Sequence, residues 1–251
     1  MLETKNLTIR FGGHVAVDRV SCVFEPGTLT AIVGPNGAGK TTFFNLISGQ
    51  LRATEGSVEL DGVDLTGEGV SARTHRGIGR AFQLTQLFPG LSVLENVRLA
   101  VQSRRRQGLD LWSVWLDRRE TLERARALVE RVQLDDRADV IASKLAHGDQ
   151  RKLEVAMLMA LEPSVYMFDE PTAGMSVDDA PVVLDLIRGL KLERSKTVLL
   201  VEHKMDVVRE LADRIIVLHN GQLVADGLPE AVIASPIVQS AYLGLAPAGT
   251  L

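Results

Sequence analysis

Residues 34–41 of this chain read Gly34-Pro35-Asn36-Gly37-Ala38-Gly39-Lys40-Thr41. The stretch matches in full a pattern that is typical of loops that cradle nucleotide phosphates. Its glycines let the backbone wrap so that N–H groups point inward at phosphate oxygens. Lys40 would add positive charge at the β- and γ-phosphates, and the hydroxyl of Thr41, which Thr42 follows, could bind Mg²⁺. The stretch therefore predicts a nucleotide-binding site.

The neighbouring sequence favours this interpretation over a glycine-rich turn that merely contains a lysine. An apolar run at residues 29–33 predicts a strand directly before the loop. Residues 40–48 predict a helix, which Gly49 would close. A strand, a loop and a helix in this order form the context in which the motif binds phosphate.

The rest of the chain alternates between strand-rich and helical parts. Asp61-Gly62 and Asn220-Gly221 predict hairpin turns. Short apolar runs at residues 165–168 and 197–201 predict buried parallel strands. Further strands are expected at residues 7–10, 20–24, 57–60, 214–218 and 222–225.

A block with a mainly helical pattern interrupts this α/β arrangement at residues 93–159, where Leu122, Ala125, Val129 and Val132 recur at helical spacing. We expect residues 1–82 and 163–227 to form the α/β core together with a β subdomain. Residues 83–162 would form the helical part, and residues 228–251 a C-terminal tail.

Two of the predicted strands end at ionisable side chains. Asp169 and Glu170 follow one strand, and His203 follows the next. Asp169 could bind Mg²⁺ through a water, Glu170 could polarise an attacking water, and His203 could donate a hydrogen bond to the γ-phosphate. An acidic pair after a strand is more often a loop entrance or a helix cap, and a lone histidine there is more often structural. The phosphate-binding pattern upstream favours the catalytic interpretation.

Composition limits the possible classes of protein. With 251 residues, 45% of them apolar and 24% charged, the chain can form a globular α/β domain. A net charge of -4 gives no reason to expect a nucleic-acid partner. The lone Cys22 excludes a disulfide framework and is expected to be a small buried residue. Neither a secretory signal nor an apolar run long enough to cross a bilayer is visible, so a membrane would be reached through a partner.

The segment Leu145-Ala146-His147-Gly148-Asp149-Gln150 comes directly before a predicted helix. Because a glycine next to a helix start can bind an anion, the segment is a second potential phosphate site. Taken alone it would be an ordinary loop and helix cap. The helix is expected to be strongly amphipathic, with one apolar face that contains Leu153, Ala156, Met157, Ala160 and Leu161.

The ordered set of motifs between positions 34 and 203 resembles the ABC (ATP-binding-cassette) ATPase family, in which Gln83 would be the loop glutamine that contacts Mg²⁺. The resemblance implies one nucleotide-binding domain over residues 1–251. Its fold would be α/β, with a P-loop NTPase (RecA-like) core, an N-terminal antiparallel β subdomain and an inserted helical subdomain. ATP and Mg²⁺ are the implied cofactors, the metal being held by Thr41, Gln83 and Asp169. Phe11 would lie under the adenine, with a role in the core as the alternative.

In that family two cassettes pair head to tail, and a signature segment of one covers the nucleotide of the other. Residues 145–150 would act in trans in this way, in a homodimer or with a sister ATPase. Transmembrane permease subunits and, indirectly, a substrate-binding protein are the other implied partners, at the cytoplasmic face of the cell membrane.

The signature segment departs from the usual Leu-Ser-Gly-Gly-Gln at Ala146, His147 and Asp149. We expect Asp149 to face away from the phosphate, because its charge would repel it. Gly148 has to be accessible to a partner. His147 is hypothesised to supply the hydrogen-bond donor that Ala146 lacks. The loop at Ala173-Gly174-Met175-Ser176 also lacks the aspartate that is common there.

Within the family, residues 145–154, the loop at residues 173–175 and the tail at residues 241–244 resemble ATPases of branched-chain amino-acid importers. Residues 103–120, which include Trp112 and Trp115, also fit, and the run Arg104-Arg105-Arg106 is expected to be a solvated turn. The expected function is ATP hydrolysis that drives such an importer. The alternatives are the ATPase of a lipid or polysaccharide exporter, a P-loop kinase, and a non-transport ABC protein of ribosomes or DNA.

Overall fold

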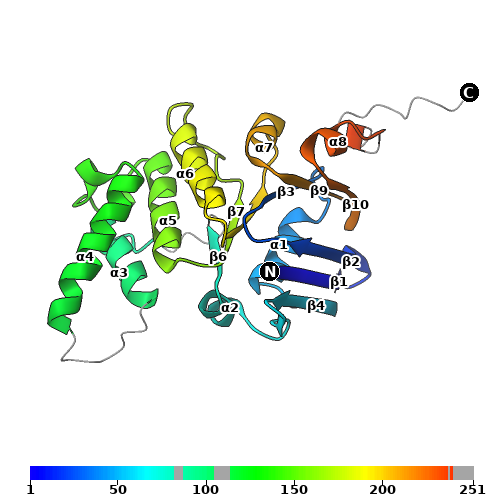
Figure 1. Ribbon diagram of the computed structural model, residues 1–251, viewed down its shortest axis with the longest axis horizontal. Helices are drawn as coiled ribbons and strands as arrows, with labels where there is room; N and C mark the ends of the chain where they lie inside the picture. Colours follow the sequence, from blue (N-terminus) through cyan, green and yellow to red (C-terminus); the bar gives the residue numbers. More distant parts are fainter. Residues whose placement is uncertain (82–86, 105–113, 237, 240–251) are drawn as a thin grey trace, which may run out of the picture. The chain divides into compact units, whose positions relative to one another are not determined.

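The computed structural model describes residues 1–81, 87–104, 114–236 and 238–239 (Figure 1). The chain forms two compact units. The first contains Met1–Ile78, Ser164–Glu170 and Leu190–Leu251, and the second contains Gly79–Pro163 and Pro171–Gly189. Pro171–Gly189 therefore clusters with the helical residues, whereas the sequence grouped it with the core.

The first unit begins with an antiparallel sheet in the order β2-β1-β4-β5. The expected strands are present, and β1 and β2 are longer than the sequence indicated. The hairpin turn at Asp61-Gly62 is confirmed by the antiparallel pairing of β4 with β5. The strands are β1 (Leu2–Phe11), β2 (His14–Phe24), β4 (Glu55–Leu60) and β5 (Val63–Asp64). Cys22 of β2 is buried as predicted, and this burial raises the pKa of its thiol to about 12.

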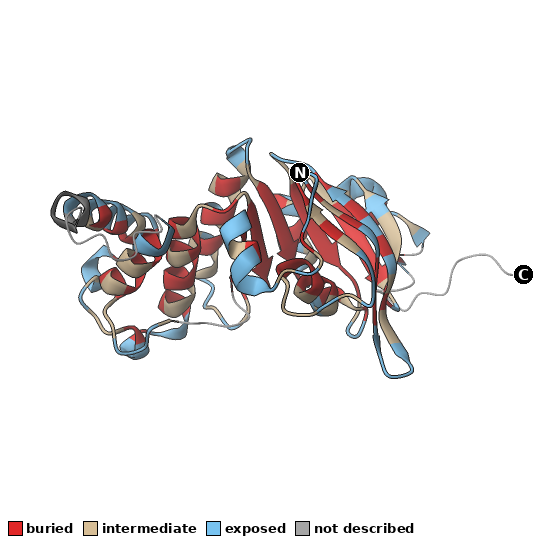
Figure 2. Cartoon of the chain, turned by 90° about the horizontal axis from the view of Figure 1, so that it is seen from below, coloured by how far each residue is buried: buried red, intermediate tan, exposed pale blue. Residues whose placement is uncertain are grey.

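A second sheet has the order β10-β9-β3-β8-β7-β6. Three adjacent parallel strands of this sheet, at residues 29–33, 197–201 and 165–169, are buried along their whole length, as the uninterrupted apolar runs predicted. Figure 2 shows this burial as red strands. The last hairpin, β9 with β10, turns at Asn220-Gly221 as expected. The strands are β3 (Leu29–Val33), β6 (Ile78–Ala81), β7 (Val165–Asp169), β8 (Thr197–Val201), β9 (Arg214–His219) and β10 (Gln222–Gly227).

Helix α1 (Lys40–Ser48) follows β3 and ends at Gly49, whose backbone is left-handed as a C-cap requires. Its last turn is held by a buried arginine of α2 (Val70–Arg76). Arg73 Nη1 donates hydrogen bonds to the carbonyl oxygens of Leu46 and Ile47 at 2.6 and 2.8 Å. Because these carbonyls have no partner within the helix, Arg73 fixes the end of α1 that lies opposite the phosphate-binding stretch. The unit is completed by α7 (Met205–Leu211) and α8 (Pro229–Ile233).

The second unit is mainly helical, as predicted. It contains α3 (Val93–Arg104), α4 (Val114–Arg131), α5 (His147–Leu161) and most of α6 (Ala180–Leu192). The helical spacing of Ala125, Val129 and Val132 is confirmed by their burial.

The expectation of a one-sided α5 is wrong, because α5 buries polar residues as well as apolar ones. Lys152 and Glu154 are both buried, together with Leu153 and Val155. Ion pairs with neighbouring side chains make the burial of these charges possible. Among the residues that the structure describes, none of the helices combines the length and the apolar character needed to cross a membrane.

Candidate nucleotide site

The phosphate loop, residues 34–41, connects β3 to α1 in the first unit. Lys40 is buried, and its Nζ donates hydrogen bonds to the carbonyl oxygens of Gly34 and Pro35 at 2.7 and 3.0 Å. Burial lowers the pKa of Lys40, and the charges of Glu170 and Asp169 oppose this shift. Its ammonium therefore lies in the electrostatic field of both acidic side chains. Asn36, Gly37 and Thr41 are exposed, while Thr42 and Pro35 are half-buried and Ala38 is buried.

The β9–β10 hairpin contacts the phosphate loop and supports its backbone. The Gly221 N–H donates to the carbonyl oxygen of Ala38 at 3.0 Å. Gly34 adopts φ 156°, and a Cβ at this position would overlap the carbonyl oxygen of Leu218. Only glycine fits this close approach of two backbones, which explains the first glycine of the pattern.

The strand ends bring two predicted catalytic side chains together. β7 and β8 are parallel neighbours, so residues that follow them meet at one edge of the sheet. His203 Nε2 lies 2.8 Å from Oε1 of Glu170. Glu170 has φ 50°, and its N–H donates to the carbonyl oxygen of Val201 at 2.9 Å. Asp169 is buried at the end of β7, beside the half-buried Glu170.

Magnesium prefers oxygen ligands and is commonly bound by one or two protein groups together with nucleotide phosphates. The exposed Thr41 hydroxyl and the carboxylate of Asp169 fit that donor set, and both belong to the first unit. No cluster of three or more His, Cys, Asp or Glu side chains suited to a metal occurs in the described ranges, so the phosphates would have to supply further ligands.

Phe11 lies at the end of β1, and its side chain is 50% exposed. The alternative that Phe11 belongs to the core is therefore wrong. An exposed aromatic ring at this position is available to stack on a base.

The signature segment, residues 145–150, belongs to the second unit. Ala146 and His147 are exposed, and α5 begins at His147. Gly148 is buried, contrary to the expectation that it is accessible. A Cβ at Gly148 would lie 2.6 Å from Oδ2 of Asp179, so this side chain covers the glycine.

The other members of the signature segment face into their own unit. Leu145 and Asp149 are buried, and Gln150 Nε2 donates to the carbonyl oxygen of Leu145 at 3.2 Å. Asp149 accepts hydrogen bonds from Arg137 and Lys152. The carboxylate of Asp149 is thus neutralised inside the unit, in agreement with the expectation that it faces away from a phosphate.

Several predicted features lie outside the described residues. They are Gln83, Arg105, Arg106, the side chains of Trp112 and Trp115, and the tail at residues 241–244. Arg104, which was assigned to a solvated turn, is the exposed last residue of α3 and forms an ion pair with Glu162.

Sequence reasoning missed three side chains that position the site. Arg73 holds α1, and Lys152 and Asp179 hold the signature segment. The only signal for Lys152 was its place three residues after Asp149 on a predicted helix. Nothing local marks the contacts of Arg73 with α1 or of Asp179 with Lys152, because these partners are distant in sequence.

A family model described as ABC transporter matches residues 17–173, more than half of the chain. The chain belongs to the ABC transporter family. The ABC cassette is accordingly an ATPase whose ATP hydrolysis is coupled to transport, and the prediction of family and activity is confirmed. The P-loop kinase alternative is excluded.

The cassette is similar over its whole length to named relatives. High-affinity branched-chain amino acid transport ATP-binding protein LivG of Escherichia coli (strain K12) is 38% identical over 97% of this chain and 98% of the relative. BraF of Pseudomonas aeruginosa has the same identity and coverage. Probable LivG of Archaeoglobus fulgidus is 36% identical over 97% of this chain and 95% of that protein.

Solved structures confirm the predicted fold. The ATP-binding cassette MJ1267 in its ADP conformation has a TM-score of 0.82 and 31% identity, covering 98% of this chain and 99% of that one. The dimeric cassette MJ0796 bound to ADP and Pi has a TM-score of 0.78 and 27% identity, covering 91% and 99%. An ABC cassette of this kind has permease subunits as partners.

Proposed function

We propose that this chain is the ATP-hydrolysing subunit of an ABC importer for branched-chain or related amino acids. The observation that carries the proposal is the 38% identity to LivG and BraF across nearly the full length of each chain. That similarity covers the helical unit and the signature segment as well as the phosphate loop. No observation on this chain favours an exporter.

In the proposed site, the N–H groups of the phosphate loop and Lys40 bind the β- and γ-phosphates. Phe11 stacks on the adenine, and Thr42 lies next to the phosphates. Thr41, Gln83 and Asp169 would hold Mg²⁺, which when bound neutralises phosphate charge.

Hydrolysis is a transfer of the γ-phosphoryl group from ATP to water. Glu170 accepts the hydrogen bond of the attacking water and takes up its proton, while ADP leaves with the electron pair of the broken bond. His203 Nε2, 2.8 Å from the Glu170 carboxylate, can donate its single hydrogen to that carboxylate in the nucleotide-free chain. When ATP is bound, the same N–H can donate to the γ-phosphate instead. The two side chains thus act as one unit.

The catalytic site would be completed by a second cassette, either another copy or a sister ATPase. The dimeric MJ0796 structure with ADP and Pi supports this arrangement. Leu145, Ala146, His147, Gly148, Asp149 and Gln150 would then cover the nucleotide of the partner. Because Gly148 is buried, Ala146 and the ring of His147 provide the exposed contact. The assembly would be peripheral, on the cytoplasmic face of the cell membrane, with permease subunits and indirectly a substrate-binding protein.

The test is uptake of radiolabelled leucine by vesicles that contain the permease subunits with this chain and are supplied with the substrate-binding protein. Glu170→Gln should bind ATP with wild-type affinity but lose hydrolysis and uptake, because the group that accepts the proton is gone. Lys40→Ala should lose ATP binding itself. Wild-type vesicles that hydrolyse ATP without taking up any branched-chain amino acid would reject the substrate class. Export of lipid by the same vesicles would identify the alternative.

A further inference from the structure

A partly buried network of charges holds the signature segment within its own unit. Lys152 Nζ lies 2.6 Å from Oδ1 of Asp179 and 3.3 Å from Oδ1 of Asp149. Asp149 also accepts a hydrogen bond from Arg137. Two cations and two carboxylates therefore alternate, so that each charge has a neighbour of opposite sign. None of the roles proposed above requires Lys152 or Asp179.

The burial of this network makes its geometry restrictive. The side chains of Lys152 and Asp149 are 9% and 7% exposed, and that of Asp179 is 33% exposed. An ammonium removed from water in this way is strongly destabilising unless carboxylates surround it. The hydrogen bond from Lys152, followed by one from Ser176, holds the pKa of Asp179 below its ordinary value. Asp179 therefore remains ionised and paired.

The carboxylate of Asp179 also positions the signature segment. Asp179 covers Gly148, where a Cβ would come within 2.6 Å of Oδ2. The preceding residue, His147, has its ring beside Gly174. A Cβ placed at Gly174 would lie 3.2 Å from Nε2 of His147. The loop that contains residues 174–179 thus supports the first residues of α5 at two points. Within this loop, Ser176 Oγ donates a hydrogen bond to Oδ2 of Asp179 at 2.7 Å, which fixes the Asp179 carboxylate.

We propose that Lys152 and Asp179 are positioning residues for ATP hydrolysis, because their ion pair orients the exposed Ala146-His147 edge of the signature segment toward the nucleotide of a partner. The inference rests on the proposed function, in which this segment acts across a dimer. Neither side chain touches the nucleotide. Asp179 acts by packing against Gly148, and Lys152 acts through its ion pair with Asp149. Both contacts hold the start of α5, and with it the exposed residues of the signature segment.

The aspartate at position 149, which departs from the usual signature, explains why the Lys152–Asp179 pair is needed. A neutral residue at position 149 would require no cation, whereas the Asp149 carboxylate is buried and needs both Arg137 and Lys152. Losing the ion pair would leave charges uncompensated and move the start of α5. A displacement of about 1 Å at a catalytic contact lowers rates by up to about 100-fold.

The experiment measures ATP hydrolysis by the assembled transporter complex that carries Asp179→Asn, Lys152→Met, the double variant or Lys152→Arg. Asp179→Asn keeps size and removes only the charge. We expect kcat to fall about tenfold or more for each charge-removing variant, with KM for ATP within about twofold of wild type. The double variant should lose little more than either single one, because the pair acts as a unit. Lys152→Arg should restore most of the rate.

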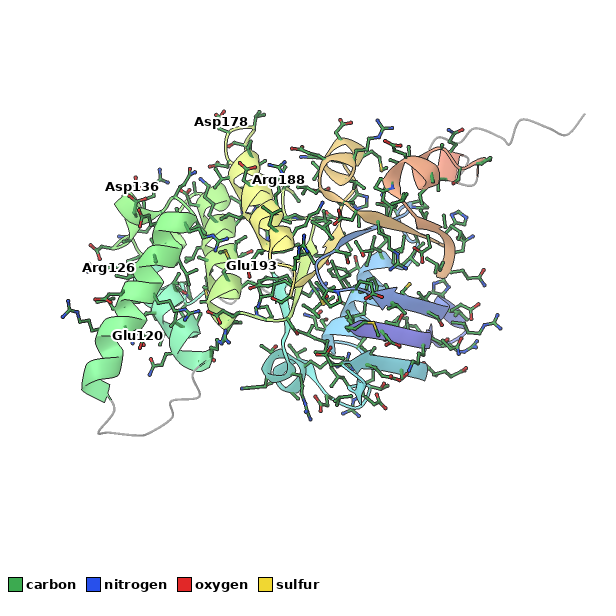
Figure 3. The ribbon with its side chains drawn as sticks, in the orientation of Figure 1. Glu120, Arg126, Asp136, Asp178, Arg188 and Glu193 are labelled. Atoms are coloured by element: carbon green, nitrogen blue, oxygen red, sulfur yellow. The ribbon has the colours of Figure 1, made fainter. Side chains whose placement is uncertain are left out.

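Asp178→Asn is the matched control. Asp178 is the adjacent carboxylate, and it is exposed, with its side chain at the outer end of the loop before α6 (Figure 3). This variant should hydrolyse ATP at the wild-type rate. The isolated chain should bind a fluorescent ATP analogue equally well with or without the substitution at Asp179, because the phosphate loop belongs to the other unit.

A wild-type rate in the Asp179→Asn complex would overturn the proposal. So would a loss that is matched by weaker nucleotide binding of the isolated chain, since this would show a general structural defect. If Lys152→Met does not fold, the more exposed Asp179→Asn carries the test alone. Failure of leucine uptake by wild-type vesicles rejects the proposed substrate, but it leaves the comparison of hydrolysis rates valid.

Discussion

Replacement of Arg73 by methionine tests whether one buried side chain stabilises the helix that starts at the phosphate loop. Arg73 is 2% exposed and donates four hydrogen bonds, all to backbone carbonyl oxygens. Their acceptors are Leu46 at 2.6 Å, Ile47 at 2.8 Å, Glu68 at 2.9 Å and Thr66 at 3.2 Å. Methionine fills similar apolar volume and makes none of these bonds.

The expected loss follows from the number of orphaned acceptors. Leaving one buried polar group without its partner costs about 1 kcal/mol or more, so four carbonyls give about 4 kcal/mol. Burial lowers the pKa of Arg73, and the charges of Glu68 and Asp64 oppose this shift. Burying the guanidinium is thus itself unfavourable, and removing it recovers part of this desolvation free energy. A net loss of about 3 kcal/mol is still a large share of the free energy of unfolding of a typical domain.

The assay is urea unfolding followed by far-UV circular dichroism, with Arg76→Met as the control. Arg76 lies on the same helix, but it is exposed and forms an ion pair with Glu68 Oε1 at 3.1 Å. An exposed pair contributes less than about 1 kcal/mol. Arg73→Lys should fall between wild type and Arg73→Met. A loss below about 1 kcal/mol for Arg73→Met, or an equal loss for Arg76→Met, would refute the reasoning.

Three further predictions concern single side chains. Gly34→Ala should abolish ATP binding in a fluorescent-nucleotide titration, because its Cβ would overlap the Leu218 carbonyl oxygen; normal affinity would contradict this account of the loop. Burial raises the pKa of Glu154 to about 7, against the smaller opposing effect of Arg151, so stability should fall as pH rises from 4.5 to 7. Glu154→Gln should remove this dependence of stability on pH, and it should raise the free energy of unfolding at pH 8 by at most roughly 3 kcal/mol. An unchanged pH dependence in chemical unfolding of the variant would contradict this account. Cys22 should resist iodoacetamide at pH 8 until urea unfolds the chain, and labelling of the folded protein would be the contrary result.

The sequence predicted best those elements whose signals are local. The bounds of β3, α1 and β8 agree with the expected residues, because short apolar runs and a glycine C-cap mark them directly. The sequence also placed Glu170 and His203 directly after two successive predicted strands, and the structure shows that these strands are parallel neighbours, so that the two side chains meet. These features need no knowledge of distant contacts.

What the sequence could not predict depends on partners far along the chain. Lys152 and Glu154 were not among the residues expected on the packed face of α5, yet both are buried and form ion pairs. Gly148 looked accessible until the structure placed Asp179 over it. Exposure of Phe11 likewise could not be read from its neighbours. Burial of a charge or exposure of an aromatic ring is a property of packing, which local pattern does not contain.

The hydrogen bond from Gly221 to Ala38 has a consequence for the synthesis of this protein. The ribosome makes the phosphate loop early, but the hairpin that supports it emerges roughly 180 residues later, which takes on the order of ten seconds or more. β3 also needs both of its neighbours, β8 and β9, from the last part of the chain. A nascent chain truncated before the hairpin would therefore carry the whole phosphate-binding motif without the hydrogen bond and the neighbouring strand that support it in the folded protein.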